Sequence, residues 1–506
     1  MASEKDDLVW VLDKRVAILS VFAFAFLVRV LISLHPYSGE GKPPMYGDYE
    51  AQRHWMEITV HTPVKEWYRN TTNNDLKYWG LDYPPLTAYQ SYVHGLALQA
   101  LEPQSVALHT SRGYETPSSK LLMRWTVLSS DVLIFFPAVL FFIFAYYQGM
   151  KDEELAWALA MVLLQPCLML IDHGHFQYNC ISLGFTVGAI AAVISRRELL
   201  ASVLFCLALN HKQMSAYYAP AFFAHLLGKC IRRQKPIYEV IKLGLAVLIT
   251  FTVVWWPFIY SKEAILEVLA RLAPFERGIY EDYVSSFWCA TSLFIKWKQR
   301  FSMLTLSRFA LGATLTATLP SMVQQICAPS NRGFLYALLN SSFAFYLFSY
   351  QVHEKSVLLP LLPASLLVLE EPRLFKWLIF YAMLSMYPLL RRDELTTCYI
   401  ALLCLFILLF YAPVERKMEV SRNDKIQQRA PKFLRLLMQL SFLIIVILHL
   451  SYMLLQPPKR YPFIFEALIT SFAFSQFAVL AIYTNIKQWR LPRDMAYSSI
   501  GKEKIY

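Results

Sequence analysis

The sequence predicts an all-α polytopic membrane protein, and three of its features carry this prediction. Of its 506 residues, 56% are hydrophobic, 15% are aromatic and only 17% are charged, whereas a soluble chain carries about a quarter charged residues. Runs such as Val16–Leu34 and Phe442–Leu455 reach or approach the roughly 20-residue apolar length that crosses a bilayer as a helix. The Lys and Arg residues lie between apolar runs, so the net charge of +12 is typical of membrane topology and indicates no nucleic-acid partner.

Basic clusters orient the predicted helices, because Lys and Arg near the ends of membrane spans stay on the cytoplasmic side. The clearest clusters are Arg196–Arg197, Gly228–Lys235, Glu415–Arg435 and the tail after Lys487. Placing all of them on one side predicts a path of about fourteen spans with both termini in the cytoplasm. The predicted spans are residues 16–34, 120–147, 153–171, 177–194, 199–210, 214–228, 238–258, 303–325, 334–350, 356–370, 374–390, 395–412, 434–455 and 463–485.

This path divides the chain into three parts. Residues 1–258 form a predicted N-terminal catalytic transmembrane module, which contains a long lumenal loop at residues 35–119. Residues 259–302 form a second lumenal loop, and residues 303–506 form a C-terminal transmembrane module with a cytoplasmic tail. Asn70, within the first loop, begins the N-glycosylation sequon Asn-Thr-Thr, which supports the lumenal position of that loop.

Three stretches allow more than one interpretation. The first apolar run is interpreted as an uncleaved anchor, because the following LHPYS lacks the small-x-small pattern of a signal-peptide cleavage site. The two spans within residues 199–228 are short, so a broken or re-entrant pair is the alternative. The run Leu86–Leu101 is predicted to be an amphipathic helix on the lumenal membrane surface, since the basic clusters would no longer share one side if it crossed the bilayer.

The stretch GDYEAQRHW follows the first apolar run and is rich in charge. Asp48 is a good N-cap for the helix expected there. On that helix Glu50 and His54, and likewise Arg53 and Glu57, are four residues apart and would pair on its surface. Two interpretations remain open: a capped, salt-paired helix, or a general base near the membrane surface. Such a carboxylate could deprotonate a sugar hydroxyl of a lipid-linked substrate while a phosphate leaves the anomeric carbon.

The stretch DHGHFQYN places His173, His175 and Gln177 between two apolar runs. Polar side chains at membrane depth are costly, so these three are functional candidates. His173 and His175 beside Asp172 resemble a metal-ligand cluster. However, no third compact set of ligands is evident, and the eight cysteines form no CxxC pair. Hydrogen bonding is therefore favoured over metal binding.

Further polar clusters lie at the ends of apolar runs. Asp82 and Tyr83 lie in WGLDYPPLTAY of the first loop, Lys212 lies in NHKQM, and His353–Lys355 forms HEK. The basic residues could merely extend toward the membrane interface, or they could form a cationic clamp for a phosphate or pyrophosphate group. The stretch RGIYEDYVSSFWC mixes charge and aromatic rings, as a sugar-binding surface or a loop over a cleft would.

Together, these motifs closely resemble those of the endoplasmic-reticulum dolichyl-phosphate-glucose α-1,3-glucosyltransferases, which are GT-C-fold enzymes. The resemblance rests on GKPPMYGDYEAQRHWMEIT, KYWGLDYPPLTAY, HTSRGYE, LIDHGHFQYN, FERGIYEDYVSSFWC and FSYQVHEKS. Within that family, the branch that adds the second glucose is expected to read TDFEVHRNW and HIHFQYN. This chain has GDYEAQRHW, HGHFQYN and KQM, so it resembles the branch that adds the first glucose to a nine-mannose oligosaccharide.

The resemblance implies that Asp48 is the general base that activates the acceptor hydroxyl, with inversion at the anomeric carbon. It implies dolichyl-phosphate-glucose as donor, a dolichol-pyrophosphate-linked oligosaccharide as acceptor, contact with membrane lipid, and no metal or other cofactor. The candidate substrate-binding residues are Glu50, Arg53, His54, Asp82, Tyr83, His173, His175, Gln177, Lys212, His353, Glu354 and Lys355.

The expected location is the endoplasmic-reticulum membrane, with a lumenal active site. The C-terminal GKEKIY looks like a cytoplasmic dilysine-type retrieval signal built from Lys502 and Lys504. The alternatives are the second-glucose transferase and, from a different class, a polytopic lipid transporter or scramblase. A transporter is expected to show internal repeats or spans broken by Gly and Pro at the midplane, and no repeat is apparent.

Overall fold

The computed structural model describes residues 14–272, 278–280, 283–411 and 432–491. Within these ranges the chain forms helices joined by turns and loops, and the only β-type pairing is an isolated bridge between Tyr280 and Val352. This confirms the predicted all-α class. The proposed retrieval signal and most of the basic cluster at 415–435 lie outside the described residues.

A helix occupies each of the ranges predicted as spans. The long helices are α1 (Lys14–Ser33), α11 (Pro236–Trp255), α15 (Met303–Cys327), α16 (Asn331–Phe348), α18 (Pro372–Arg392), α20 (Lys432–Leu454) and α21 (Ile464–Trp489). The other α-helices are α2 (Gly47–His61), α3 (Pro85–Leu101), α4 (Pro117–Ser130), α5 (Phe136–Tyr146), α6 (Asp152–Leu163), α7 (Pro166–Met169), α8 (Asn179–Ile194), α9 (Glu198–His211), α10 (Ala219–Ile231), α12 (Lys262–Leu272), α13 (Phe287–Thr291), α14 (Trp297–Arg300), α17 (Leu358–Leu366) and α19 (Thr396–Tyr411).

Short 3-10 or π-helical turns join several of these helices. They are η1 (Val64–Glu66), η2 (Pro103–Val106), η3 (Asp131–Phe135), η4 (Leu170–Phe176), η5 (Gln213–Tyr218), η6 (Trp256–Phe258) and η7 (Glu354–Val357). Because η3 runs from α4 directly into α5, residues Pro117–Tyr146 form one continuous helical stretch. In the pair predicted at 199–228, α9 packs on α8, whereas α10 packs on α15 and α16.

Five helical stretches in the described part of the chain are long and apolar enough to cross a membrane. They are Lys14–Ser33, Pro117–Tyr146, Asp152–Phe176, Pro236–Phe258 and Ile464–Trp489. Outer helices also expose large apolar side chains; on α11, only Thr250 and Val254 are buried. Contiguous exposed apolar surface of this kind fits contact with lipid. The chain is therefore an all-α membrane protein, while the number of crossings stays a prediction.

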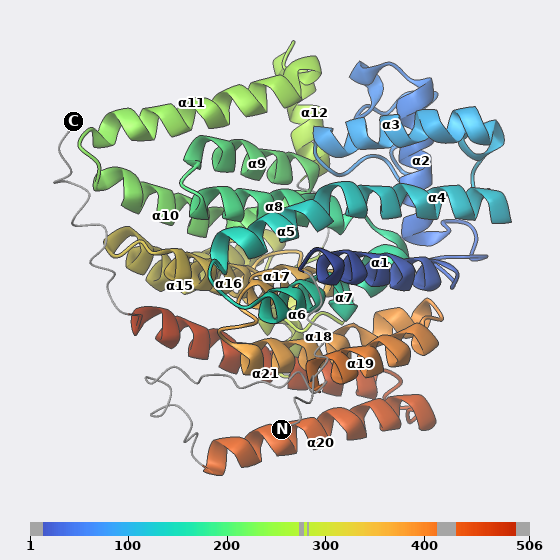
Figure 1. Cartoon of the computed structure of the whole chain (residues 1–506). Helices are drawn as coiled ribbons and strands as arrows, with labels where there is room; N and C mark the ends of the chain where they lie inside the picture. Colours follow the sequence, from blue (N-terminus) through green and yellow to red (C-terminus); the bar gives the residue numbers. More distant parts are fainter. Residues whose placement is uncertain (1–13, 273–277, 281–282, 412–431, 492–506) are drawn as a thin grey trace, which may run out of the picture.

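The successive long helices alternate in direction, so their connections gather at two ends of the bundle. In Figure 1 the long helices run across the picture in nearly one direction, and α2 stands across them at one end. Contacts with Asp48, Gln177 and His175 place the connections at Lys212, at η7 and between α18 and α19 at this end, which we call the Asp48 end. In Figure 1 the turn between α8 and α9, which holds Arg196–Arg197, and the turn between α10 and α11 lie at the opposite end. Two predicted basic clusters therefore do share one end of the molecule.

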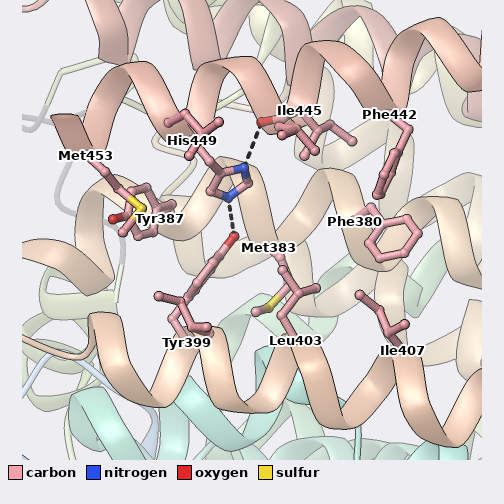
Figure 2. Close-up of a pocket in the computed structure, with 13 residues that line it drawn as sticks. Phe380, Met383, Tyr387, Tyr399, Leu403, Ile407, Phe442, Ile445, His449 and Met453 are labelled. Atoms are coloured by element: carbon pink, nitrogen blue, oxygen red, sulfur yellow. Dashed lines mark hydrogen bonds between the residues drawn. The ribbon is translucent and has the colours of Figure 1, made fainter. Parts of the chain in front are cut away.

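The central helices are buried on nearly all sides. In α8, α16 and α18 most residues are inaccessible to solvent, and they belong to one large apolar core. A separate apolar cavity lies between α18, α19 and α20, where Tyr399 and Ile445 hold the ring of His449 by hydrogen bonds (Figure 2). None of the residues that line this cavity belongs to the polar clusters of the Asp48 end.

One buried ion cluster ties α1 to the middle of the α4–α5 stretch. Asp131 Oδ2 accepts hydrogen bonds from Arg29 Nε at 2.5 Å and from His173 Nε2 at 2.9 Å. The side chains of Arg29 and Asp131 are 0% and 1% exposed. Removing one partner of such a pair leaves an uncompensated charge in an apolar interior.

We predict that Asp131→Ala lowers the free energy of unfolding by about 3–5 kcal/mol, because Arg29 is left buried without its counter-charge. Thermal unfolding of the purified full chain in lipid nanodiscs measures this effect. The matched control is Asp152→Ala, which removes an ion pair with Lys14 whose two side chains are 40% and 53% exposed. Equal shifts in the two variants would contradict the importance of the buried cluster.

Candidate active site

Left-handed backbone, rather than a side-chain cap, starts the helix that carries Asp48. Tyr46 is the N-cap residue of α2, with a φ of 53° and no side-chain cap bond, and Gly47 follows with a φ of +67°. A Cβ at Gly47 would lie 2.5 Å from the carbonyl oxygen of Ser38, so only glycine fits there. The predicted N-cap role of Asp48 is therefore wrong. Asp48 lies in the first turn of α2, with its side chain turned to other parts of the chain.

Three donors from two distant segments meet one carboxylate oxygen of Asp48. Oδ2 accepts hydrogen bonds from Lys355 Nζ at 2.6 Å, Gln177 Nε2 at 2.6 Å and His175 Nε2 at 3.0 Å. Among the described residues no donor reaches Oδ1, and the Asp48 side chain is 26% exposed. One oxygen of this carboxylate is therefore fixed by the protein, while the other is open to a ligand.

Charge keeps Asp48 ionised. Burial by itself would raise the pKa of Asp48, but the charge of Lys355 and the hydrogen bonds from His175 and Lys355 outweigh it and hold this pKa well below its usual value. Burial also opposes the charge on Lys355, but Asp48 more than compensates and raises the pKa of Lys355. Asp48 and Lys355 therefore form an ion pair at neutral pH.

The π-helical turn η4 directs the DHGHFQYN side chains to different partners. His173 turns to Asp131, whereas His175 turns to Asp48 and Asp393. Asp172 accepts hydrogen bonds from the Cys180 N–H and from Asn179 Nδ2, both at 2.7 Å, and so satisfies the start of α8. The described residues contain no group of three or more His, Cys, Asp or Glu side chains placed to hold one metal ion.

Lys212 holds the amide that contacts Asp48. Its Nζ donates to Gln177 Oε1 at 2.9 Å and to Asn179 Oδ1 at 2.6 Å. Because Oε1 accepts from Lys212, the Gln177 amide must present its Nε2 donor to Asp48. Burial, followed by the charge of Lys355, lowers the pKa of Lys212. Lys212 is thus enclosed and does not extend to the membrane interface.

Asp82 and Tyr83 border Lys212. Lys212 Nζ lies 5.0 Å from the centre of the Tyr83 ring, in a cation–π contact. The carbonyl oxygen of Asp82 accepts a hydrogen bond from Gln213 at 3.1 Å. The structure therefore brings this predicted motif of the first loop next to the NHKQM turn.

Glu50, Arg53 and His54 belong to a buried network on another face of α2. Arg53 forms two hydrogen bonds of 2.7 Å to Glu50 and one of 2.7 Å to Glu57, and His54 lies 3.2 Å from Glu57. These four side chains are 0–1% exposed. The Arg53–Glu57 pair forms as predicted, whereas Glu50 pairs with Arg53 rather than with His54. The predicted position on the helix surface is wrong, because residues 102–111 fold over this face and Ser111 donates to Glu57.

Within the HEK segment, Lys355 is the residue that contacts Asp48. His353 precedes η7 as its N-cap residue, and Glu354 lies 3.5 Å from Arg392. The second predicted loop reaches this segment, because Gln351 donates its N–H to the carbonyl oxygen of Ile279 at 3.0 Å. The predicted glycosylation site, Asn70, is exposed in the first loop.

Comparison with known proteins places the chain in a family. The sequence profile described as the ALG6, ALG8 glycosyltransferase family matches residues 25–483. A protein of Arabidopsis thaliana named "Probable dolichyl pyrophosphate Man9GlcNAc2 alpha-1,3-glucosyltransferase" is 56% identical over 498 residues, 96% of this chain and 92% of that protein. The chain belongs to the ALG6, ALG8 glycosyltransferase family.

Relatives from other lineages carry the same kind of name. A Dictyostelium discoideum protein with the same printed name is 42% identical and spans 92% of this chain and 94% of its own length. A Gallus gallus protein named "Dolichyl pyrophosphate Man9GlcNAc2 alpha-1,3-glucosyltransferase" is 40% identical, with 91% and 94% coverage. The family predicted from the motifs is confirmed, and the chain is a glycosyltransferase.

Asp393 is the residue of this glycosyltransferase's candidate site that sequence reasoning missed. It follows α18, and its Oδ2 lies 2.5 Å from His175 Nδ1. Within the run Arg391–Glu394, Asp393 looks like an ordinary charge at the end of a span. The available signal was its position, since the predicted path puts this end of the span on the same side as Asp48.

We predict that Lys355→Met moves the acidic limb of the pH profile of kcat/KM to higher pH. Lys355 lowers the pKa of Asp48, so its loss raises that pKa, and a carboxylate that acts when ionised then loses its charge at a higher pH. The residual glycosyl transfer of the purified variant is measured between pH 5 and 8. Lys65→Met, at an exposed position of the first loop, is the control. An unchanged acidic limb would contradict the coupling.

Proposed function

We propose that this chain transfers the first glucose from dolichyl-phosphate-glucose to the nine-mannose dolichol-pyrophosphate oligosaccharide, in α-1,3 linkage. The observation that carries the proposal is the asymmetry of the Asp48 carboxylate, whose Oδ2 takes three donors while Oδ1 stays open. The printed names of the relatives, which cover most of this chain, support the acceptor and the linkage. The donor is proposed from the motif resemblance.

In the proposed reaction the acceptor hydroxyl attacks the anomeric carbon of glucose on the face opposite the phosphate. The new C–O bond forms as the bond between the anomeric carbon and the phosphate oxygen breaks, and dolichyl phosphate leaves with the electron pair. Asp48 Oδ1 takes the hydroxyl proton, as a general base. A β-linked donor then gives an α-linked product by a single inversion.

Lys355 is proposed to serve both the base and the leaving phosphate. Its side chain is 19% exposed and its Nζ is shared with Asp48 at 2.6 Å. When Lys355 turns toward a bound phosphate, Asp48 loses the charge that most depresses its pKa and becomes a stronger base. The cation of Lys355 would thereby stabilise the leaving group in a site that works without a metal or other cofactor.

The other candidate residues are proposed to have two kinds of role: some contact the substrates, and others hold Asp48 in position. His353, Asp82 and Tyr83 are partly exposed and are proposed to contact the substrates. Gln177 is proposed to hold Asp48 by its hydrogen bond, and Lys212 is proposed to hold Gln177.

A second set supports the same position from the protein interior. His173, Glu354 and the network of Glu50, Arg53 and His54 are buried. They are proposed to contribute to substrate binding by holding η4, η7 and α2 in position.

The membrane arrangement is part of the proposal. We place the Asp48 end in the lumen of the endoplasmic reticulum and both termini in the cytoplasm, with about fourteen spans in a GT-C fold and the division at residues 258 and 303. The basic turns at the opposite end support this orientation. In the lumen, the exposed Asn70 would be open to glycosylation.

The substrate test uses the purified full chain in proteoliposomes with labelled dolichyl-phosphate-glucose and two lipid-linked acceptors. Transfer to the unglucosylated nine-mannose acceptor is expected. Transfer only to the acceptor that already carries one glucose would identify the second-glucose transferase. Movement of labelled lipid across the bilayer without transfer would identify a lipid transporter.

We predict that Asp48→Asn reduces kcat by at least about 10²-fold, because general base catalysis contributes roughly 10² to 10⁴-fold. An amide of the same shape cannot take the proton. The thermal midpoint and donor binding report whether the site remains folded. Asp152→Asn, at the opposite end of the bundle, is the control. Turnover of Asp48→Asn at the rate of that control would remove Asp48 as the base.

A further inference from the structure

We propose that Asp393 is a positioning residue, which acts through His175 to hold the base Asp48 with its Oδ1 toward the acceptor. This inference rests on the proposed function and extends it to the C-terminal half of the chain. Its basis is the line of groups Asp48, His175 and Asp393. The two His175 ring nitrogens face the two carboxylates, Nε2 to Asp48 at 3.0 Å and Nδ1 to Asp393 at 2.5 Å.

The contacts of His175 define its protonation. An ionised carboxylate can only accept a hydrogen bond, so a ring nitrogen that faces one must carry a proton. His175 faces a carboxylate on each side and is 2% exposed. We assign His175 as an imidazolium that donates to both Asp48 and Asp393. Its Nε2 is the only ring nitrogen that faces Asp48.

Charge balance makes Asp393 necessary for this state. Lys355 Nζ lies 3.2 Å from His175 Nε2, so two cations sit side by side at Asp48 Oδ2. Asp48 alone balances one of them, and Asp393 balances the other. The four side chains together carry no net charge, which suits a site that is largely withdrawn from water.

Other charged groups near Asp48, His175 and Asp393 bind partners other than the His175 ring. Arg124 of α4 donates to the backbone carbonyl oxygens of His173 and Gly174. The Arg29–Asp131 pair binds His173 on its own side of η4, and Lys212 binds Gln177 and Asn179. Lys355 and the two carboxylates are thus the ionisable groups that touch the His175 ring.

The backbone brings Asp393 to His175 by a close approach at Gly174. A Cβ at Gly174 would lie 3.0 Å from Leu395 Cδ1, which is tighter than ordinary contact. Asp393 ends α18 and donates its N–H to the carbonyl oxygen of Leu389 at 3.3 Å. Its side chain is 7% exposed, so it contacts His175 and does not line the open side of the site.

Loss of the Asp393 charge should change the protonation of His175 before it changes the fold. Asparagine at position 393 can still accept the Nδ1–H, so the shape is kept. The imidazolium then has one counter-charge for two cations, and it releases its Nε2 proton more readily. Nε2 and Asp48 Oδ2 become two acceptors that face each other, and the base is displaced.

We predict that Asp393→Asn lowers kcat at pH 7.5 on the order of 10²-fold, as a displaced catalytic group does, while the KM for the donor is unchanged. Activity should recover as the pH is lowered, because a lower pH restores the proton on His175. Asp393→Glu should restore much of the activity at pH 7.5, because it restores the charge. Glu394→Gln, at the exposed neighbouring residue, should behave as the unmodified chain.

The outcomes separate this inference from the proposed function. The assay uses the purified full chain with both lipid substrates, and thermal unfolding checks that each variant is folded. Equal loss at every pH, or no rescue by glutamate, would show a purely structural role for Asp393 and overturn the inference. Unchanged kcat in Asp393→Asn would also overturn it. None of these results touches the proposed function, which instead fails if the unmodified chain does not transfer glucose to the nine-mannose acceptor.

Discussion

The site depends on one carboxylate oxygen that three donors share. Asp48 Oδ2 is fixed by His175, Gln177 and Lys355, which come from two segments more than a hundred residues away along the chain. A carboxylate held in this way cannot rotate freely, so its second oxygen points in one direction. In the proposed reaction, pre-organisation of this kind would let a weak base act on a sugar hydroxyl, because the reacting atoms would already be aligned when the substrates arrive.

An apolar helical bundle makes this arrangement costly and also makes it specific. Each buried charge at the Asp48 end must find a partner, since unpaired charges in such surroundings are strongly unfavourable. Asp48 with Lys355 and His175 with Asp393 meet this requirement across four separate elements. Buried charges are also paired on the other side of η4, where Arg29 and Asp131 join α1 to η3. The packing of the bundle therefore also brings the residues of the site together.

Local sequence patterns predicted the helices and much of the site, because both leave local signals. Apolar runs mark the helices, and Asp48 and Lys355 stand out as charges at the ends of those runs. Asp393 also stands at the end of an apolar run, but so do Arg391, Arg392 and Glu394. Only the contact between η4 and the end of α18 distinguishes it from them. The burial of Arg53 was missed for a similar reason: a spacing of four residues predicts the pair with Glu57, but not the residues at 102–111 that cover it.

The central claim is that Asp48 Oδ1 meets the acceptor hydroxyl while Oδ2 stays bound to the protein. The most direct measurement is an experimental structure of the full chain with an unreactive donor analogue and the lipid-linked acceptor. We predict that the accepting hydroxyl oxygen lies at hydrogen-bond distance from Oδ1, roughly 2.6–3.2 Å, with the glucose carbon beyond it and His175 still on Oδ2. A hydroxyl that contacts another base, with Asp48 turned away from both substrates, would contradict the account.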